Sequence, residues 1–223
     1  IRNIIGQTKS SFRIDEVMDT KKVLLLNLSK GLLGDLNANL LGMIFVSKIQ
    51  SAAMRRQKID VKDRVDFFFY IDEFQNFVNE SIESILSEAR KYRLSLNMAH
   101  QYIGQLEKSD ALTKSSLNLK DAVFGNVANK MAYRVGPEDG EFLAKEFAPQ
   151  FSDADLILQD ALKSACKISV DNQPSKPFSL NVVKYWEEYE PEDPKLAKAF
   201  AELSRLKYGR EKEFVDKEIL FRI

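Results

Sequence analysis

Two adjacent carboxylates, Asp72 and Glu73, follow directly after an unbroken apolar run from Phe67 to Ile71. A short run of this kind is typical of a central strand in a parallel sheet that is covered on both faces. Ligands of open α/β sheets bind beyond the carboxyl ends of the strands, where both side chains would lie. A carboxylate pair there suits a Mg²⁺ ion and a water molecule that attacks a phosphate, the arrangement called Walker B, so nucleotide hydrolysis is the leading hypothesis. The alternative is that Asp72 and Glu73 are ordinary polar residues at the point where a strand leaves the core.

A second strand is predicted beside the first one. Residues 80–92 carry apolar side chains at helical spacing, and a short apolar run from Leu94 to Ala99 then ends at His100 and Gln101. Because parallel neighbours bring their carboxyl ends to one edge of the sheet, we expect Gln101 to face the same pocket as Glu73. A glutamine amide can donate to a phosphate oxygen and accept from water, so Gln101 could sense the terminal phosphate.

Composition limits the possible classes of protein. The chain has 223 residues, 44% hydrophobic and 30% charged, which predicts one large domain or one domain with an appendage. Its 33 basic and 33 acidic side chains cancel, so any contact with DNA must come from a local patch. Cys166 is the only cysteine, which excludes an internal disulfide, and His100 is the only histidine, which argues against a zinc site. No apolar stretch is long enough for a membrane span, so we expect the chain as given to be soluble.

The N-terminal part predicts a strand, a loop and a helix in that order. Val23 to Asn27 is interpreted as another buried strand, and a glycine-bearing loop from Ser29 to Asn37 follows it. A long helix is then expected up to about Arg56, buried against the sheet by its many apolar residues. Three basic residues indicate that this helix leaves the core at its end and reaches solvent: Arg55, Arg56 and Lys58.

The C-terminal part is less regular. We expect a short strand at Asn129–Val135, a helix after Gly136, and two strands, Ala165–Val170 and Phe178–Val182, joined by a proline-bearing loop. A final helix is predicted to start at Asp193 as its N-cap and to stop at Gly209. Its apolar residues recur at helical spacing, and packing within the chain is their expected role: Leu196, Phe200, Leu203 and Tyr208.

A loop that cradles phosphates, of the form G-x-x-x-x-G-K-[ST], does not occur in the sequence. The stretch from Gly6 to Ser10 has a lysine and a serine but lacks the glycine scaffold. Either the loop lies upstream of Ile1 or the protein is not a nucleotidase. Since the sequence begins with isoleucine rather than methionine, we expect an upstream portion that holds the loop.

Several segments in this order resemble a known family. They are Ile5–Phe12, Leu24–Gly31, Tyr70–Phe74, and Ala89–Leu94 followed by Ala99–Gln101. Over about residues 1 to 185 the chain is similar to the C-terminal half of the type IV secretion coupling protein ATPases. These are the VirD4, TraD and TraG-like motors of conjugative DNA transfer, relatives of the FtsK and HerA translocases. In that family the P-loop lies well upstream.

The resemblance implies an α/β fold: a three-layer, mostly parallel RecA-like sheet, with residues 1–185 in the motor domain and 186–223 as a helical extension. It also implies a homo-hexameric ring that binds ATP and Mg²⁺ between subunits. The expected substrate is DNA or a relaxase–DNA complex, and the expected partners are the ATPases of the secretion channel and inner-membrane components. The full-length protein is expected on the cytoplasmic side of the bacterial inner membrane, held by an N-terminal anchor.

The resemblance also implies roles for individual residues. Asp72 would orient the magnesium shell through water, Glu73 would polarise the attacking water, and Gln101 would sense the γ-phosphate. Arg90 matches the position of an arginine finger that reaches into the neighbouring subunit's site, and Arg93 could substitute for it. Alternatively, Arg90 is a basic residue that the dipole at a helix C-terminus favours.

The leading hypothesis is therefore the Walker B half of a conjugative DNA-transfer ATPase that is inactive in isolation. One alternative is a HerA or FtsK-type DNA translocase outside secretion. The other is a non-catalytic DNA-binding or assembly module that keeps the sheet without using a nucleotide.

Overall fold

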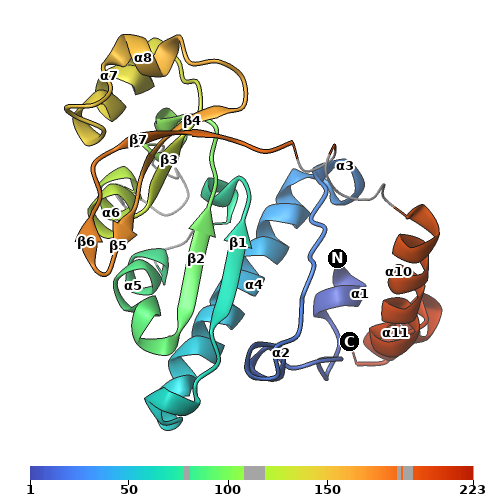
Figure 1. Cartoon of the computed structure of the whole chain (residues 1–223). Coiled ribbons are helices and arrows are strands. Elements are labelled where there is room, and N and C mark those ends of the chain that lie inside the picture. The colour runs from blue at the N-terminus through green and yellow to red at the C-terminus, as the bar shows by residue number, and fades with distance from the viewer. Residues whose placement is uncertain (78–80, 108–118, 185–186, 188–192, 223) are drawn as a thin grey trace.

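The computed structural model of the chain combines a parallel pair of strands with an antiparallel sheet, and helices pack around both (Figure 1). The fold is thus α/β, as predicted, and a three-layer RecA-like arrangement stays a prediction. The expected mostly parallel sheet is wrong for the described strands, because only one of their pairings is parallel. The structure describes residues 1–77, 81–107, 119–184, 187 and 193–222.

The parallel pair forms the unit that the sequence predicts around the two carboxylates. Strand β1 (Phe67–Ile71) pairs in register with strand β2 (Leu94–Met98). Helix α5 (Ser81–Glu88) and the short 3-10 helix η4 (Ala89–Tyr92) form the crossover between them. The predicted strand, helix and second strand are confirmed.

Strand β1 is covered on one face only in the described part of the chain. Its residues Phe67 and Phe69 pack with Ile71 against the hydrophobic core. Phe68 and Tyr70 point the other way and are 60% and 73% exposed. The prediction of a strand covered on both faces is therefore wrong here, because side chains alternate along a strand and the core helices pack on a single face.

Helix α4 (Asp35–Arg55) is the long buried helix that the sequence predicts. Its core-facing residues include Val46, Ile49 and Ala52, which pack with β1 and α5. Gly42 permits a close approach at this interface, because a Cβ atom there would lie only 2.1 Å from the ring of Phe77. The turn after β1 is thus held directly against α4.

Segment 22–29 is irregular and pairs with none of the described strands. Val23 and Leu25 are 85% and 88% exposed, while Leu24 between them packs against the core. In Figure 1 the segment leads as an irregular trace to helix α3 (Lys30–Leu33). The prediction of a buried strand at Val23–Asn27 is therefore wrong, since alternate side chains face solvent and no strand ladder forms.

The second sheet is antiparallel, with the order β3-β4-β7. It consists of β3 (Lys130–Ala132), β4 (Lys163–Lys167) and β7 (Phe178–Asn181), and a small hairpin of β5 (Ser169–Val170) and β6 (Gln173–Pro174) connects the last two. The predicted strand within 129–135 and the predicted pair of later strands are confirmed.

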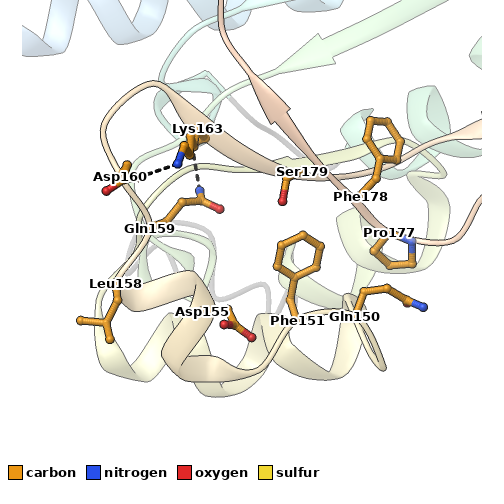
Figure 2. A pocket seen from close by; sticks show the side chains of 10 residues that line it. All are labelled: Gln150, Phe151, Asp155, Leu158, Gln159, Asp160, Lys163, Pro177, Phe178 and Ser179. Carbon is orange, nitrogen blue, oxygen red and sulfur yellow. Dashed lines mark hydrogen bonds and ion pairs between the residues drawn. The ribbon is translucent and has the colours of Figure 1, made fainter.

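Helices α7 (Pro137–Glu146) and α8 (Asp153–Ile157) pack against this sheet, and the helix predicted after Gly136 is confirmed. Helix α6 (Leu119–Asn126) links the two parts of the core, because Phe124 packs against both hydrophobic clusters. An open hollow of about 510 Å³ lies between α8 and β7 (Figure 2). Phe151 and Phe178 line it, and it contains none of the predicted site residues.

The C-terminal helices are α10 (Pro194–Tyr208) and α11 (Lys212–Leu220). Asp193 caps α10 by accepting from two backbone N–H groups, and Gly209 ends the helix, as predicted. Most of the apolar stripe of α10 is exposed in the described structure, with Phe200 63% accessible, so its assignment to an intramolecular core is wrong for Leu196, Phe200 and Leu203. Tyr208 is half-buried and packs edge-on against Phe12, with the ring centroids 5.7 Å apart.

Helix α11, not α10, makes the main contact with the rest of the chain. It packs on α1 (Arg2–Ile5) through the buried residues Val215 and Ile219, and Arg2 pairs with Asp216 at 2.9 Å. The boundary between residues 185 and 186 stays a prediction. None of the helices in the described residues is long and apolar enough for a membrane span.

Arg56 is buried, although the sequence predicts that it reaches solvent. It begins the 3-10 helix η1 (Arg56–Lys58) at the end of α4, and only 1% of it is exposed. Its Nε donates to Asp19 at the end of α2 (Ile14–Asp19), at 2.8 Å, and its Nη1 donates to the carbonyl of Tyr92 at 2.9 Å. The guanidinium therefore ties three elements together. Arg55 and Lys58 are exposed, as predicted.

We predict that Arg56→Met lowers the free energy of unfolding by about 3 kcal/mol, because it leaves Asp19 and the Tyr92 carbonyl without their donor. Urea unfolding followed by circular dichroism would measure this loss. The matched variant Arg55→Met should change stability by less than about 0.5 kcal/mol, since that side chain is exposed. Equal effects of the two substitutions would contradict the clamp role of Arg56.

Candidate functional site

The carboxyl ends of β1 and β2 lie side by side and bring the predicted site residues to one edge. The ladder continues past both strands: the N–H of Ala99 donates to Ile71 at 3.0 Å, and the N–H of Phe74 donates to Ala99 at 3.2 Å. Across this edge the side-chain amide of Gln101 donates from Nε2 to Oε1 of Glu73 at 2.6 Å. The predicted proximity of these two residues is confirmed.

Glu73 occupies a tight turn in the left-handed region, with φ 49° and ψ 45°. A non-glycine residue is uncommon there, and such conformations concentrate at functional sites. The turn is held by Asp72, whose Oδ1 accepts from the N–H of Glu73 at 3.0 Å, and by Asn76, whose amide donates to the Glu73 carbonyl at 3.1 Å. Phe74 anchors it from below, because its ring is buried in the core.

The Glu73 carboxylate accepts from two amides. Besides Gln101, the side chain of Gln75 donates from Nε2 to Oε2 at 2.6 Å. These two hydrogen bonds lower the pKa of the Glu73 carboxyl below its ordinary value, and the bond from Gln75 has the larger effect. The positive charge of Lys30 acts in the same direction, while partial burial opposes it. Glu73 is therefore ionised at neutral pH and is a weak proton acceptor.

Asp72 is exposed and borders open space. It lines a hollow of about 900 Å³ whose lining residues come mainly from β1, β2, α6 and β3, and Gln101, Tyr70 and Arg90 line the same hollow. Among the described residues no three His, Cys, Asp or Glu side chains form a metal cluster. A single carboxylate at an open edge nevertheless suits Mg²⁺, which keeps several waters and binds proteins through one or two carboxylates together with substrate phosphates.

His100, which follows β2, packs against the turn of Glu73. Its ring meets Phe74 edge-on, with the ring centroids 5.8 Å apart. Its Nδ1 atom is buried and has no hydrogen-bond partner in the described structure. The side chain thus supports the turn by packing.

Arg90 and Arg93 lie at the opposite end of β2 from Gln101, because they precede the strand whereas Gln101 follows it. A five-residue strand separates the two ends by roughly 16 Å. Arg90 donates to Asn172 Oδ1 at 2.9 Å, and Arg93 pairs with Asp66 at 3.3 Å. Neither arginine therefore bonds to Glu73 in the described structure, although Arg90 lines the same hollow as Asp72 and Gln101. Action on a neighbouring subunit and a structural role are the two alternatives.

Three residues near the site were not predicted from the sequence: Gln75, Gln105 and Lys30. Gln105 accepts at Oε1 from the backbone N–H groups of Gln101 (3.0 Å) and Tyr102 (3.2 Å) and so fixes the backbone that carries the Gln101 side chain. Gln75 stands two residues after Glu73, and this spacing in a tight turn was an available signal. Lys30 and Gln105 gave no such signal, because only the folded chain places them here.

We predict that Gln101→Leu raises the pKa of Glu73 toward its ordinary value, because the carboxylate loses one donor. With a lowered pKa, Glu73 stabilises the fold above its ordinary pKa, and this contribution is lost as the pH falls through the lowered value. In Gln101→Leu this contribution should therefore be smaller, and its loss should be complete at a higher pH than in the wild type. Carboxyl ¹³C shifts from an NMR titration would show the change. Asp160, whose pKa is lowered by Lys163, is the internal control and should titrate as in the wild type.

The chain was compared with known proteins. Residues 66–165 match a family model described as the TraM recognition site of TraD and TraG. A solved structure of a bacterial conjugative coupling protein, TrwBdeltaN70 in an unbound monoclinic form, aligns with a TM-score of 0.50 and 11% identity. The alignment covers 69% of this chain and 37% of that chain, and at this identity it supports the fold alone. No curated protein matches. These findings confirm that the chain resembles the C-terminal region of the type IV secretion coupling proteins, over the segment that carries the candidate site.

Proposed function

We propose that this chain is part of an ATP-hydrolysing motor that couples DNA, or a relaxase–DNA complex, to a type IV secretion channel. The match of residues 66–165 supports a coupling-protein domain of conjugative DNA transfer. The observation that carries the motor proposal is the 2.6 Å hydrogen bond between Glu73 and Gln101 across two parallel strands. It unites a carboxylate and an amide at the edge where α/β sheets bind their ligands.

In the proposed mechanism Asp72 and Glu73 have different tasks. Asp72 orients the water shell of Mg²⁺, and the bound ion would neutralise the phosphate charge that develops during transfer. Glu73 remains ionised and accepts a hydrogen bond from the attacking water. Because its pKa is lowered, it orients and polarises this water and is not suited to removing a proton completely before attack.

Gln101 is proposed to report the terminal phosphate. Its backbone is held by Gln105, whereas its side chain is exposed and, among the described residues, donates to Glu73 across the gap between the strands. An amide that donates to a carboxylate can donate equally well to a phosphate oxygen, since both are anionic acceptors. A bound γ-phosphate would thus compete with Glu73 for the same donor.

Arg90 is proposed as the arginine that acts on the neighbouring subunit's site in a homo-hexamer, with Arg93 as the alternative. Its place at the far end of β2 rules out contact with its own Glu73 in this conformation, which is what an arginine acting in trans requires. The bond to Asn172 would have to break first.

A partner-recognition role for the same region is the second candidate function. The matched family model is described by recognition of TraM, not by catalysis. A relaxosome protein is therefore the proposed partner of residues 66–165. The proposed location of the full-length protein is the cytoplasmic side of the inner membrane, next to the ATPases of the channel.

We predict that Glu73→Gln in the full-length protein lowers kcat for ATP hydrolysis by about 10²- to 10⁴-fold, because the amide no longer polarises the attacking water. Steady-state phosphate release with DNA present measures this rate. The control Glu213→Gln, on the exposed face of α11, should leave turnover unchanged. Equal turnover of wild type and Glu73→Gln would remove Glu73 from the mechanism and favour the recognition role.

We also predict that Arg90→Ala lowers turnover by about 10³- to 10⁵-fold if the arginine acts as a finger. Mixing Arg90→Ala subunits with Glu73→Gln subunits should then restore part of the activity, because mixed rings contain sites with an intact Glu73 and a neighbour's intact Arg90. Mixed rings without activity, or normal turnover of Arg90→Ala alone, would contradict a role in trans. In the second case Arg93→Ala is the next variant to test.

A further inference from the structure

The two amides that hold Glu73 differ in how firmly they are themselves held. Gln75 belongs to the 3-10 helix η3 (Phe74–Asn76) in the same turn as Glu73 and is half-buried. Gln101 is exposed and approaches from the neighbouring strand. Any movement between β1 and β2 or any competing anion acts on the Gln101 bond, whereas the Gln75 bond moves with the turn.

The position of the Gln75 side chain also destabilises the fold. Its Nε2 must face the carboxylate, since only that end of the amide can donate, and this leaves its Oε1 buried without a partner in the described structure. An unpaired buried acceptor destabilises a fold, and such groups call for a functional explanation. An apolar side chain of the same shape would avoid this cost but would lose the bond to Glu73.

From this asymmetry we propose that Gln75 is a positioning residue, a permanent holder of Glu73 Oε2, while Gln101 is the exchangeable partner of Oε1. The inference rests on the proposed hydrolysis at this site. When the γ-phosphate draws the Gln101 amide away, Oε1 becomes free to accept from the attacking water. Gln75 keeps the carboxylate oriented at that moment through its bond to Oε2. The structure thus assigns Oε1 as the oxygen that faces the water, and the presence of the phosphate as the condition that releases it.

The test compares Gln75→Met with Gln150→Met in the full-length protein. Methionine has nearly the shape of glutamine but donates no hydrogen bond, and Gln150 is an exposed glutamine near the hollow of Figure 2.

For Gln75→Met we expect kcat to fall about tenfold with an unchanged KM for ATP, because orientation is lost and binding is not. The acid limb of the kcat profile should move to higher pH, since Glu73 loses its stronger donor. The thermal midpoint should not fall, because the unpaired acceptor is removed as well. Gln150→Met should behave as wild type.

Gln75→Glu extends the series. A second carboxylate beside Glu73 disfavours the ionised form more than a missing donor does, so the acid limb should move further than in Gln75→Met. An unchanged kcat and an unchanged pH profile in Gln75→Met would overturn the proposal. So would a fall in kcat that comes with a lower thermal midpoint and no shift of the acid limb, since this pattern indicates a structural role. Both results differ from failure of the proposed function itself, which would appear as normal turnover in Glu73→Gln.

Discussion

The candidate site depends on the parallel, in-register pairing of β1 with β2. Because the two strands run in the same direction, the residues that leave them, Glu73 and Gln101, emerge at one edge and meet at 2.6 Å. An antiparallel pairing would send the amide to the opposite end of the sheet. A shift of the pairing by one residue would exchange the faces of the strand and turn the buried Ile71 toward solvent. The hydrophobic pattern of β1 therefore protects the geometry of the polar residues that follow it.

The amino end of the same sheet is fixed by a different interaction. Arg56 sits where α2, α4 and the segment before β2 meet, and it bonds a carboxylate from one element and a carbonyl from another. The two ends of β2 are thus held differently: a buried guanidinium fixes the start, and hydrogen bonds between exposed or half-buried side chains link the end to its neighbour. This contrast suits a site in which the proposed exchange of Gln101 between Glu73 and a phosphate takes place without moving the strand.

Several large apolar side chains are exposed because the described helices cover only one face of the parallel strand pair. Helices of the described chain cover one face of the parallel pair, so Phe68 and Tyr70 face solvent, and Val23 and Leu25 in segment 22–29 are exposed as well. The aligned coupling protein is considerably longer than this chain, since the alignment spans 37% of it. Most of the apolar stripe of α10 belongs to the same class of surface, because Leu196, Phe200 and Leu203 are spaced for packing but are exposed. Tyr208 at the end of the helix packs against Phe12.

The sequence by itself determined the local elements and the order in which they carry polar residues. The five-residue apolar run, the helical spacing after it, and the cap at Asp193 each depend on neighbours within a few positions, so their patterns predict them directly. The meeting of Glu73 with Gln101 followed from the same patterns, since a crossover between parallel strands has one common outcome. Tertiary structure alone decided that Arg56 is buried, that segment 22–29 stays outside the sheet, and that Gln75 turns its amide to Glu73. The first two depend on what packs against a residue from distant parts of the chain, and the third on a left-handed turn that the core beneath it holds. Spacing along the chain does not predict the first two, and for the third it gives only the short separation between Gln75 and Glu73.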